Sequence, residues 1–438
     1  MLELYFCVMA LAADAKWTGF LGAETSHVSP DSIPTEWSPE KNIAWKAALP
    51  GHGQSSPVIW GDKVFVTAIE GPNKEQNHVL CLSLKDGSEL WRKTTESSMP
   101  VKNSVYVSRA APTPCVDENG VYAFFESGDV IAYDHHGKQL WAQSLGKDYG
   151  KIESEFGIAA SPVQLKDRII IAVDFAGPSY LVALDKQDGQ EKWKTSRTSR
   201  TSWSSPYLLH TQHGTQVILS SAGSVDGYDP MHGKQLWTID GLGGNTAATP
   251  VPNQDGIFLV AASAGREGNN ENAKNSNFAM RVFSSADGTW NPEVMWRTKD
   301  ASPSFASSII YKDCAYWINR SGVVYCYDLG LGKEHYTKRV AQSSWATPVG
   351  LGNHIYFFGK DGVTTVIKAG AEFSVVSENQ LWNPEEGKAD PAAAAAEESE
   401  ERKRSAAMFG GRTQYGVAVV DGSLLIRTGD ILYCVRGQ

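Results

Sequence analysis

A tryptophan that recurs along the chain at a nearly constant interval restricts the fold more than any other feature of the sequence. Its clearest copies lie 44 to 52 residues apart, at Trp45, Trp91, Trp141, Trp193 and Trp237. A glycine stands four residues before each of the last four, and residues 332–336 keep this spacing with a tyrosine at the end. Trp296 and Trp382 mark two further units. An interval of this size is typical of one supersecondary unit copied around a ring or along a solenoid.

The hydrophobic pattern between the tryptophans decides which unit is repeated. Helical repeats of similar length need apolar residues at a period of 3.6, whereas short β-branched and aromatic runs here, bounded by Gly or Asp, have a period of two. Such runs occupy residues 64–66, 169–173 and 355–358. An interval of 44 to 52 residues accommodates about four short strands with their turns, which is the size of one propeller blade.

The openings of the units give the number of blades. Small residues, in most copies followed by proline, begin each first strand, and proline is tolerated there because it need not donate to the ladder. The eight openings lie near Ser56, Thr113, Ser161, Ser205, Thr249, Ser307, Thr347 and Tyr415. The last unit ends after its third strand, and residues 43–46 form an outer strand without its own unit. We therefore predict an all-β fold: one eight-bladed propeller of four-stranded antiparallel blades, closed by an N-terminal outer strand.

The bulk properties narrow the class of protein. The net charge of −9 disfavours a nucleic-acid surface, which needs a basic face. The chain has no run of 18 apolar residues, so we expect no membrane span. Residues 1–16 are interpreted as a secretory signal, with an early apolar strand as the alternative, and residues 17–438 as the propeller.

Two insertions interrupt the repeat. Residues 265–277 are rich in Asn and are expected to form a solvated polar loop, because they lack the carboxylate spacing of a calcium loop. Residues 384–411 contain an Asp-Pro helix start and a Gly-Gly stop, and predict a single exposed helix between the seventh and eighth blades. A role of this helix in docking a partner is a hypothesis from its position alone.

The repeat resembles a known family. Its small-Pro-apolar opening, the third-strand run seen in residues 181–185 and the closing Gly-x-x-x-Trp are similar to the pyrroloquinoline-quinone (PQQ)-like repeat of quinoprotein alcohol dehydrogenase-like propellers. The resemblance extends from Trp45 to Val435. It implies a propeller in which each tryptophan packs on the neighbouring sheet and its indole N–H reaches a backbone carbonyl. It leaves function open, since the fold hosts dehydrogenases and an outer-membrane assembly scaffold.

The resemblance also implies what a quinone-dependent member would need. Those enzymes hold PQQ at the axis against a disulfide between adjacent cysteines and use calcium with an Asp base. The six cysteines of this chain include no adjacent pair and no C-x-x-C, and are interpreted as small buried residues. We therefore expect no cofactor and assign no catalytic or metal-binding residue; PQQ and calcium belong only to an oxidoreductase alternative.

The loops that enter the inner strands converge on the axis of a propeller, so they are the place to look for a ligand site. These loops carry Phe156, Arg200 and Phe305 besides the predicted ligand-binding residues named below. This density of aromatic and Arg residues suits the binding of a sugar, a peptide or a carboxylate. The alternative is that these residues only plug the channel. The predicted ligand-binding residues are His52, Gln54, Arg109, Glu155, Trp203, Asn245, Trp345, Arg412 and Tyr415.

These observations favour a non-catalytic binding or scaffold propeller located outside the cytoplasm, periplasmic or secreted. Its expected partner is an envelope protein or a small polar or carbohydrate ligand, and the chain is expected to be a monomer. The alternative function is a quinone- or metal-dependent oxidoreductase that uses the axial pocket.

Overall fold

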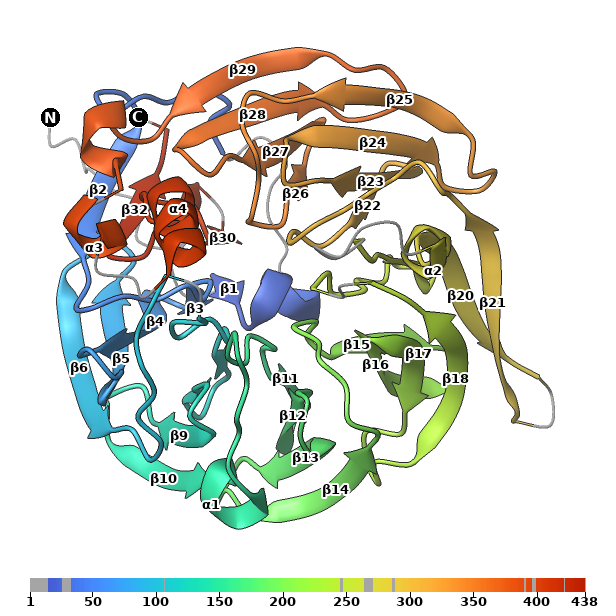
Figure 1. The fold of residues 1–438 in the computed structure, drawn as a ribbon, viewed down its shortest axis with the longest axis horizontal. Coiled ribbons are helices and arrows are strands. Elements are labelled where there is room, and N and C mark those ends of the chain that lie inside the picture. Colours follow the sequence, from blue (N-terminus) through green and yellow to red (C-terminus); the bar gives the residue numbers. More distant parts are fainter. Residues whose placement is uncertain are drawn as a thin grey trace, which may run out of the picture.

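Eight β-sheets stand in a ring around a central axis (Figure 1) in the computed structural model of the chain. The structure describes residues 15–25, 33–105, 107–244, 247–263, 271–285, 288–389, 391–395, 399–420 and 422–437. Each sheet is antiparallel throughout, and successive sheets follow the order of the chain. The prediction of a single eight-bladed β-propeller is therefore confirmed.

The first four blades lie along residues 58–242. Blade 1 contains β3 (Val58–Trp60), β4 (Lys63–Glu70), β5 (Gln76–Ser83) and β6 (Glu89–Glu96), and β1 (Lys16–Trp17) pairs with its inner edge. Blade 2 contains β7 (Cys115–Val116), β8 (Val121–Phe124), β9 (Asp129–Tyr133) and β10 (Gln139–Ser144), followed by α1 (Leu145–Tyr149). Blade 3 contains β11 (Val163–Gln164), β12 (Arg168–Val173), β13 (Ser179–Asp185) and β14 (Glu191–Arg197). Blade 4 contains β15 (Tyr207–Thr211), β16 (Gly214–Ser221), β17 (Gly223–Tyr228) and β18 (Gln235–Leu242).

The other four blades complete the ring. Blade 5 contains β19 (Ile257–Val260), β20 (Phe278–Ser284) and β21 (Trp290–Arg297). Blade 6 contains β22 (Ile309–Tyr311), β23 (Cys314–Ile318), β24 (Val323–Asp328) and β25 (Glu334–Arg339). Blade 7 contains β26 (Val349–Leu351), β27 (His354–Phe358), β28 (Val363–Lys368) and β29 (Val375–Gln380). Blade 8 contains β30 (Gly416–Val420), β31 (Ser423–Arg427), β32 (Ile431–Val435) and the N-terminal β2 (Ile43–Ala48).

Two blades differ from four strands that are consecutive in the sequence: blade 8 takes its outer strand from the N-terminus, and blade 5 lacks an inner strand among the described residues. β2 pairs with β32, with Trp45 opposite Cys434, so the N-terminal strand closes the ring as predicted. Blade 5 has three strands among the described residues rather than the four expected. Pro250 and Pro252 lie where its inner strand would run, and proline has no N–H to donate to a ladder.

The repeated tryptophans join neighbouring blades. The indole Nε1 of Trp141 donates to the carbonyl of Lys186 at 2.8 Å, and Trp45, Trp91, Trp193 and Trp296 make the same kind of bond to the following blade. The glycine of the following blade's motif lies under the ring. A Cβ on Gly189 would lie 2.6 Å from Trp141 Cε3, and Gly87 and Gly233 are equally close to their tryptophans. The motif glycine is thus the surface on which the preceding tryptophan packs.

The expectation that Trp382 is the repeat tryptophan of blade 7 is wrong. The register places Ser377 there, opposite Val366, and Trp382 follows the end of β29. Trp37 supplies the missing ring: it stacks on Tyr356 of β27 with centroids 6.4 Å apart, as Trp141 lies against Tyr122 in blade 2. The N-terminal segment therefore fills a gap in blade 7 besides closing blade 8.

A belt of hydroxyl groups surrounds the axis where the inner strands begin. The backbone N–H of Ser56 donates to Thr113 Oγ1 at 2.9 Å, and the N–H of Thr113 donates to Ser161 Oγ at 2.9 Å. The same bond joins the equivalent residues of successive blades up to Thr347. The small residues of the openings thus satisfy backbone donors between blades, and the eighth position is Gly416, which has no hydroxyl.

The insertions differ in detail from the sequence expectations. Within residues 265–277, α2 (Glu271–Asn275) is helical and Asn277 is buried, with its side-chain Oδ1 accepting from the N–H of Ala262 at 3.0 Å. The segment 384–411 holds η2 (Pro384–Gly387), α3 (Pro391–Ala395) and α4 (Glu400–Phe409) rather than one helix. None of the helices in the described ranges is long and apolar enough to cross a membrane. The proposed signal, residues 1–16, lies outside the described residues apart from Ala15 and Lys16.

One end of the axis is covered by the chain itself. The inner strands all run in the same direction, so their first residues lie at one face and their last residues at the other. η1 (Phe20–Thr25) lies at the centre of the ring in Figure 1 and contacts β1 and β30. Two hollows of about 470 and 530 Å³ flank it, lined by residues of the inner strands, such as Tyr311 and Leu208. The predicted ligand-binding loops precede the inner strands and therefore surround the opposite mouth of the axis, which we call the axial mouth.

Candidate functional site

Four consecutive residues, His52 to Ser55, bring together the last blade and the second blade at the axial mouth. The N–H of Gly53 donates to the carbonyl of Gly429 at 2.8 Å. Gln54 Oε1 accepts from the N–H of Arg109 at 3.0 Å, and the N–H of Gln54 donates to the carbonyl of Arg109 at 2.9 Å. Three predicted residues, His52, Gln54 and Arg109, are therefore neighbours across a blade interface.

A row of aromatic rings extends from this segment along the mouth. The ring of His52 meets Tyr415 edge-on at 5.9 Å between centroids, and Tyr415 meets Trp345 at 6.3 Å. Trp345 in turn lies 4.7 Å from Phe305, whose side chain is exposed. The structure thus brings Tyr415 and Trp345 of the prediction into one row, which can offer flat apolar contacts to a ligand.

Arg427, at the end of β31, is the residue of this site that the sequence analysis missed. It is fully buried, with an exposed fraction of 0%. Its Nη1 donates to Ser55 Oγ at 3.1 Å and its Nε to the carbonyl of Thr428 at 3.3 Å, while Nη2 has no partner among the described residues. Its guanidinium lies against Gly53, where a Cβ would come within 2.1 Å of Nη2.

A sequence signal for Arg427 did exist. Gly416, opposite Arg427 in the ladder, breaks the series of hydroxyl residues at the blade openings. Continuing the register of blades 1 and 4 places the uncharged residues Thr67 and Ser220 at the position of Arg427. A charged residue at the end of an apolar strand, next to a break in the repeat, indicates a special role for one blade.

Burial and mutual repulsion set the charge of the axial mouth. Burial lowers the pKa of Arg427 to about 9, so its guanidinium is still positive at neutral pH. Burial also lowers the pKa of Arg109, although the neighbouring Tyr415 and Glu126 oppose that shift. Burial and then the charges of Arg109 and Arg427 hold the pKa of His52 well below its usual value, so its imidazole is neutral at pH 7.

A buried ion pair supports the Arg109 side of the mouth. Glu126 accepts from the N–H of Ala110 at 3.0 Å and pairs with Lys74 Nζ at 3.0 Å. Both side chains are about 95% or more buried. The carboxylate of Glu126 is therefore already bound on two sides, and Arg109 Nε remains a buried donor without a partner among the described residues.

The other predicted residues lie outside this cluster. Trp203 donates from Nε1 to the carbonyl of Gly157 at 3.1 Å and packs edge-on against Phe156 at 6.1 Å, with Glu155 exposed beside it. Arg412 faces the base of the helical insertion, where it lies 3.8 Å from Glu386. Asn245 lies outside the described residues.

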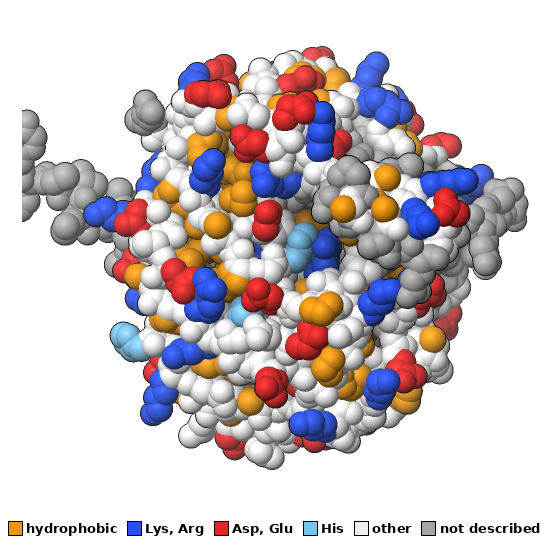
Figure 2. Space-filling view, turned by 60° about the vertical axis from the view of Figure 1, so that its left-hand side comes forward, with side chains coloured by type: hydrophobic (Ala, Val, Ile, Leu, Met, Phe, Trp, Pro, Cys, Tyr) orange, Lys and Arg blue, Asp and Glu red, His pale blue; other side chains and the backbone are white. Residues whose placement is uncertain are grey.

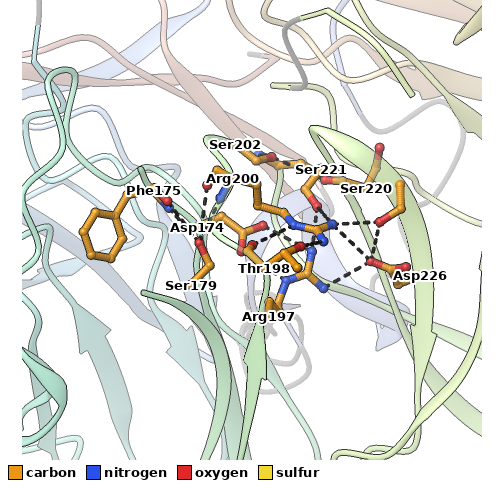
Figure 3. Close-up of polar contacts among 12 residues, drawn as sticks. Asp174, Phe175, Ser179, Arg197, Thr198, Arg200, Ser202, Ser220, Ser221 and Asp226 are labelled. Carbon is orange, nitrogen blue, oxygen red and sulfur yellow. Dashed lines mark hydrogen bonds and ion pairs between the residues drawn. The ribbon is translucent and has the colours of Figure 1, made fainter. Parts of the chain in front are cut away.

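Arg200, also expected at the mouth, belongs to an ion-pair network between blades 3 and 4 (Figure 3). Arg197 pairs with Asp174 at 3.1 Å and with Asp226 at 3.3 Å, and Arg200 lies 3.6 Å from Asp226. Ser224 donates to Asp226 at 2.9 Å. Burial raises the pKa of Asp174, a shift that Arg197 opposes. With its charges and hydrogen bonds matched, this network joins two blades.

The donors at the axial mouth do not fit calcium. Calcium takes six to eight oxygen ligands, largely carboxylates and carbonyls. The polar side chains described at the mouth include two guanidiniums, a neutral imidazole, the amide of Gln54 and the hydroxyl of Tyr415, and the carboxylate of Glu126 is held by Lys74. Acidic and basic side chains are interspersed over the face shown in Figure 2, which is hollowed near its middle. What the mouth offers chemically is a set of donors that suits an anion.

Comparison with known proteins places the chain in a family. A family model described as outer membrane protein assembly factor BamB matches residues 36–177 and 151–303. The solved structure of BamB from Moraxella catarrhalis superposes with a TM-score of 0.61 at 13% identity, covering 89% of this chain and 98% of that one. Quinohemoprotein alcohol dehydrogenase from Comamonas testosteroni gives a TM-score of 0.60 at 12% identity, covering 98% of this chain and 82% of the enzyme. At such identities the structures share a fold.

One curated relative is an enzyme. A polyvinylalcohol dehydrogenase from Pseudomonas sp is 22% identical over an alignment of 232 residues, and the match covers 49% of this chain but only 34% of that protein. The chain thus aligns with about a third of the length of this relative. The family match, by contrast, covers more than half of the chain and agrees with the eight blades. The chain belongs to the PQQ-like repeat propeller family.

Proposed function

We propose that this protein is a non-catalytic binding propeller located outside the cytoplasm, periplasmic or secreted, which recognises its ligand or partner at the axial mouth. One observation carries the proposal: within the described part of the chain, Arg427 Nη2, Arg109 Nε and His52 Nε2 are buried nitrogens without hydrogen-bond partners, on side chains beside a row of aromatic rings. Buried donors are paired in the great majority of cases, so a group of three orphaned ones implies an external acceptor.

The same groups are suited to binding rather than to proton transfer. The guanidinium of Arg427 remains positive at neutral pH, and an arginine side chain does not serve as a base in proteins. The Glu126 carboxylate accepts from Ala110 and Lys74, so it is not free to take a proton from a substrate. His52 is neutral and can accept a proton, but two neighbouring cations disfavour its charged form.

A scaffold role is supported by the match to a family described as an outer membrane assembly factor. The partner we propose is an envelope protein or a small polar or carbohydrate ligand, bound by a monomer. The helical insertion, which contains α3 and α4, stands beside blade 8 in Figure 1 and offers a second contact surface.

The proposal is tested by capture of an envelope protein on the immobilised chain. We expect capture to be lost with Trp345→Ala and Arg109→Gln, and to persist with Leu331→Ser, an exposed residue on an outer turn. Deletion of residues 388–403 tests the insertion separately. Capture that is equal for all of these variants would refute recognition at the axial mouth.

A second candidate is a quinone- or metal-dependent oxidoreductase, favoured by the similarity of half of the chain to a polyvinylalcohol dehydrogenase. PQQ and calcium would be its cofactors, although the donors described at the mouth do not fit calcium. Incubation with PQQ and calcium, followed by an assay of dye-linked alcohol oxidation, separates the two candidates. Oxidation that is lost with Arg109→Gln would refute the non-catalytic proposal.

A further inference from the structure

We propose that the axial mouth binds a carboxylate group, with the guanidinium of Arg427 as its main donor and Arg109 and His52 beside it. This inference rests on the proposed function, because it names the chemical class of ligand that the same mouth recognises. It would hold for a free organic acid and for an acidic side chain of a protein partner, because the group that is bound is the same.

The first argument is the isolation of the Arg427 charge. Arg427 is fully buried, and no carboxylate among the described residues lies within ion-pair distance of it. Asp430 acts on it only at longer range, and the Asp430 side chain is half exposed and lies 3.7 Å from Arg412 instead. A buried cation is normally paired with an anion, and the described residues supply none for Arg427, which favours a partner from a bound ligand.

The second argument is that three buried nitrogens without partners among the described residues belong to side chains grouped around one short segment. Gly53, whose lack of a side chain makes room for the Arg427 guanidinium, is next to His52 in the chain. Arg109 exchanges hydrogen bonds with Gln54, one residue further on, so both arginines flank this short segment, and their charges both lower the pKa of His52. Arg109 Nε, Arg427 Nη2 and His52 Nε2 therefore belong to side chains at or beside the segment 52–54, and a neutral His52 can donate from Nε2.

The third argument concerns the shape of the anion. A carboxylate is planar, presents two oxygens to a guanidinium edge and carries one charge, which three donors can satisfy. Phosphate and sulfate have more oxygens to satisfy and a larger charge to desolvate. The aromatic row from His52 through Tyr415 to Trp345 lies beside the donors and leaves an apolar wall for the carbon skeleton of an acid.

The test is titration of the purified full chain with succinate in a calorimeter at constant ionic strength, together with the ligand-induced shift in Tm. Succinamide, which has the same skeleton without charge, and sulfate are the controls. We expect succinate to bind, succinamide not to bind, and sulfate to bind at least tenfold more weakly. Equal binding of sulfate and succinate, or no binding of succinate, would overturn the assignment.

Variants locate the site. Arg427→Met should weaken succinate binding at least tenfold without lowering the Tm of the free protein, because it removes an unpaired buried charge. Arg109→Gln, at a partly buried position, should also weaken succinate binding at least tenfold. This second variant keeps the test valid if Arg427→Met fails to fold. Gln164→Met, in a hollow at the opposite face, is the matched control and should bind as the wild type does. Unchanged binding in both Arg variants would overturn the proposal.

The source of the carboxylate is resolved by comparing succinate with a hexaglutamate peptide and its amidated hexaglutamine counterpart. Tighter binding of hexaglutamate indicates an acidic segment of a protein, and tighter binding of succinate indicates a free acid. Binding of hexaglutamine as strong as that of hexaglutamate would overturn recognition of the charge.

Failure of this inference is distinguishable from failure of the proposed function. Absence of succinate binding leaves capture of an envelope protein standing, whereas alcohol oxidation refutes the non-catalytic proposal and leaves the titration valid.

Discussion

The contact between each motif glycine and the preceding tryptophan predicts the effect of adding a single methyl group. In Gly189→Ala the new Cβ would lie 2.6 Å from Cε3 of Trp141, and the backbone φ of +76° is unfavourable for alanine. The left-handed backbone costs about 1–2 kcal/mol. Overpacking against a buried ring costs a further 1–3 kcal/mol or so. The free energy of unfolding should therefore fall by about 2–5 kcal/mol.

Gly422 offers a matched control for this substitution. Its φ of +73° is almost the same, but a Cβ there would meet no atom within 4 Å. Gly422→Ala should therefore lose only the backbone contribution of about 1–2 kcal/mol. Both variants are compared with the wild type by guanidinium denaturation followed by tryptophan fluorescence and circular dichroism. An equal loss of stability in the two variants would refute the packing role of the motif glycine.

Three further predictions concern buried polar groups. Arg197→Met should lower the free energy of unfolding by about 3–5 kcal/mol, because it removes the guanidinium that pairs with the buried carboxylates of Asp174 and Asp226. Arg92→Met, in an exposed pair, should cost less than about 1 kcal/mol; urea denaturation distinguishes these results. Thr113→Val should cost about 1–3 kcal/mol through an unsatisfied N–H on Ser56, and Thr113→Ser far less, measured in the same way. Because the folded pKa of His52 is lowered, the unfolded chain binds the extra proton, and stability should fall as pH drops below about 6.5, by up to about 1.4 kcal/mol per pH unit for this residue. His52→Asn should flatten that pH dependence in thermal unfolding, and an unchanged slope would contradict the assignment.

The fold could be predicted because its signals repeat. The Gly-x-x-x-Trp spacing recurs since each blade needs the same glycine beneath the preceding tryptophan and the same indole hydrogen bond. The outer strand with Trp45 was recognised as the partner of β32 because the last unit lacked one. Because the blades share the same packing requirement, the same motif recurs in most units, and a single sequence shows it several times.

The sequence prediction was wrong where one blade makes the common tryptophan contact with a residue from a different part of the chain. Trp382 has the right residue type but lies beyond the end of its strand, while Trp37, more than 300 residues away, provides the contact in blade 7. No local pattern reports such a substitution by a distant segment. Among the predicted site residues, those next to the His52–Ser55 segment lie together, whereas Arg412 lies between Glu386 and Asp430, two partners that the sequence spacing does not reveal.

The break in the hydroxyl belt has a physical cause that links the ring to the site. A Cβ on Gly416 would lie 2.5 Å from Ser56 Oγ, so the junction of blades 8 and 1 is too tight for the serine or threonine that the other openings carry. The polar contact at this junction is made instead by Arg427, which reaches from the paired strand to Ser55. A hydroxyl satisfies one neighbouring N–H, but a guanidinium brings five donors and a charge, more than this junction can accept. Closure of the ring thus leaves a buried cation with spare donors at one blade interface, and that surplus is the physical basis of the anion binding that we propose for the axial mouth.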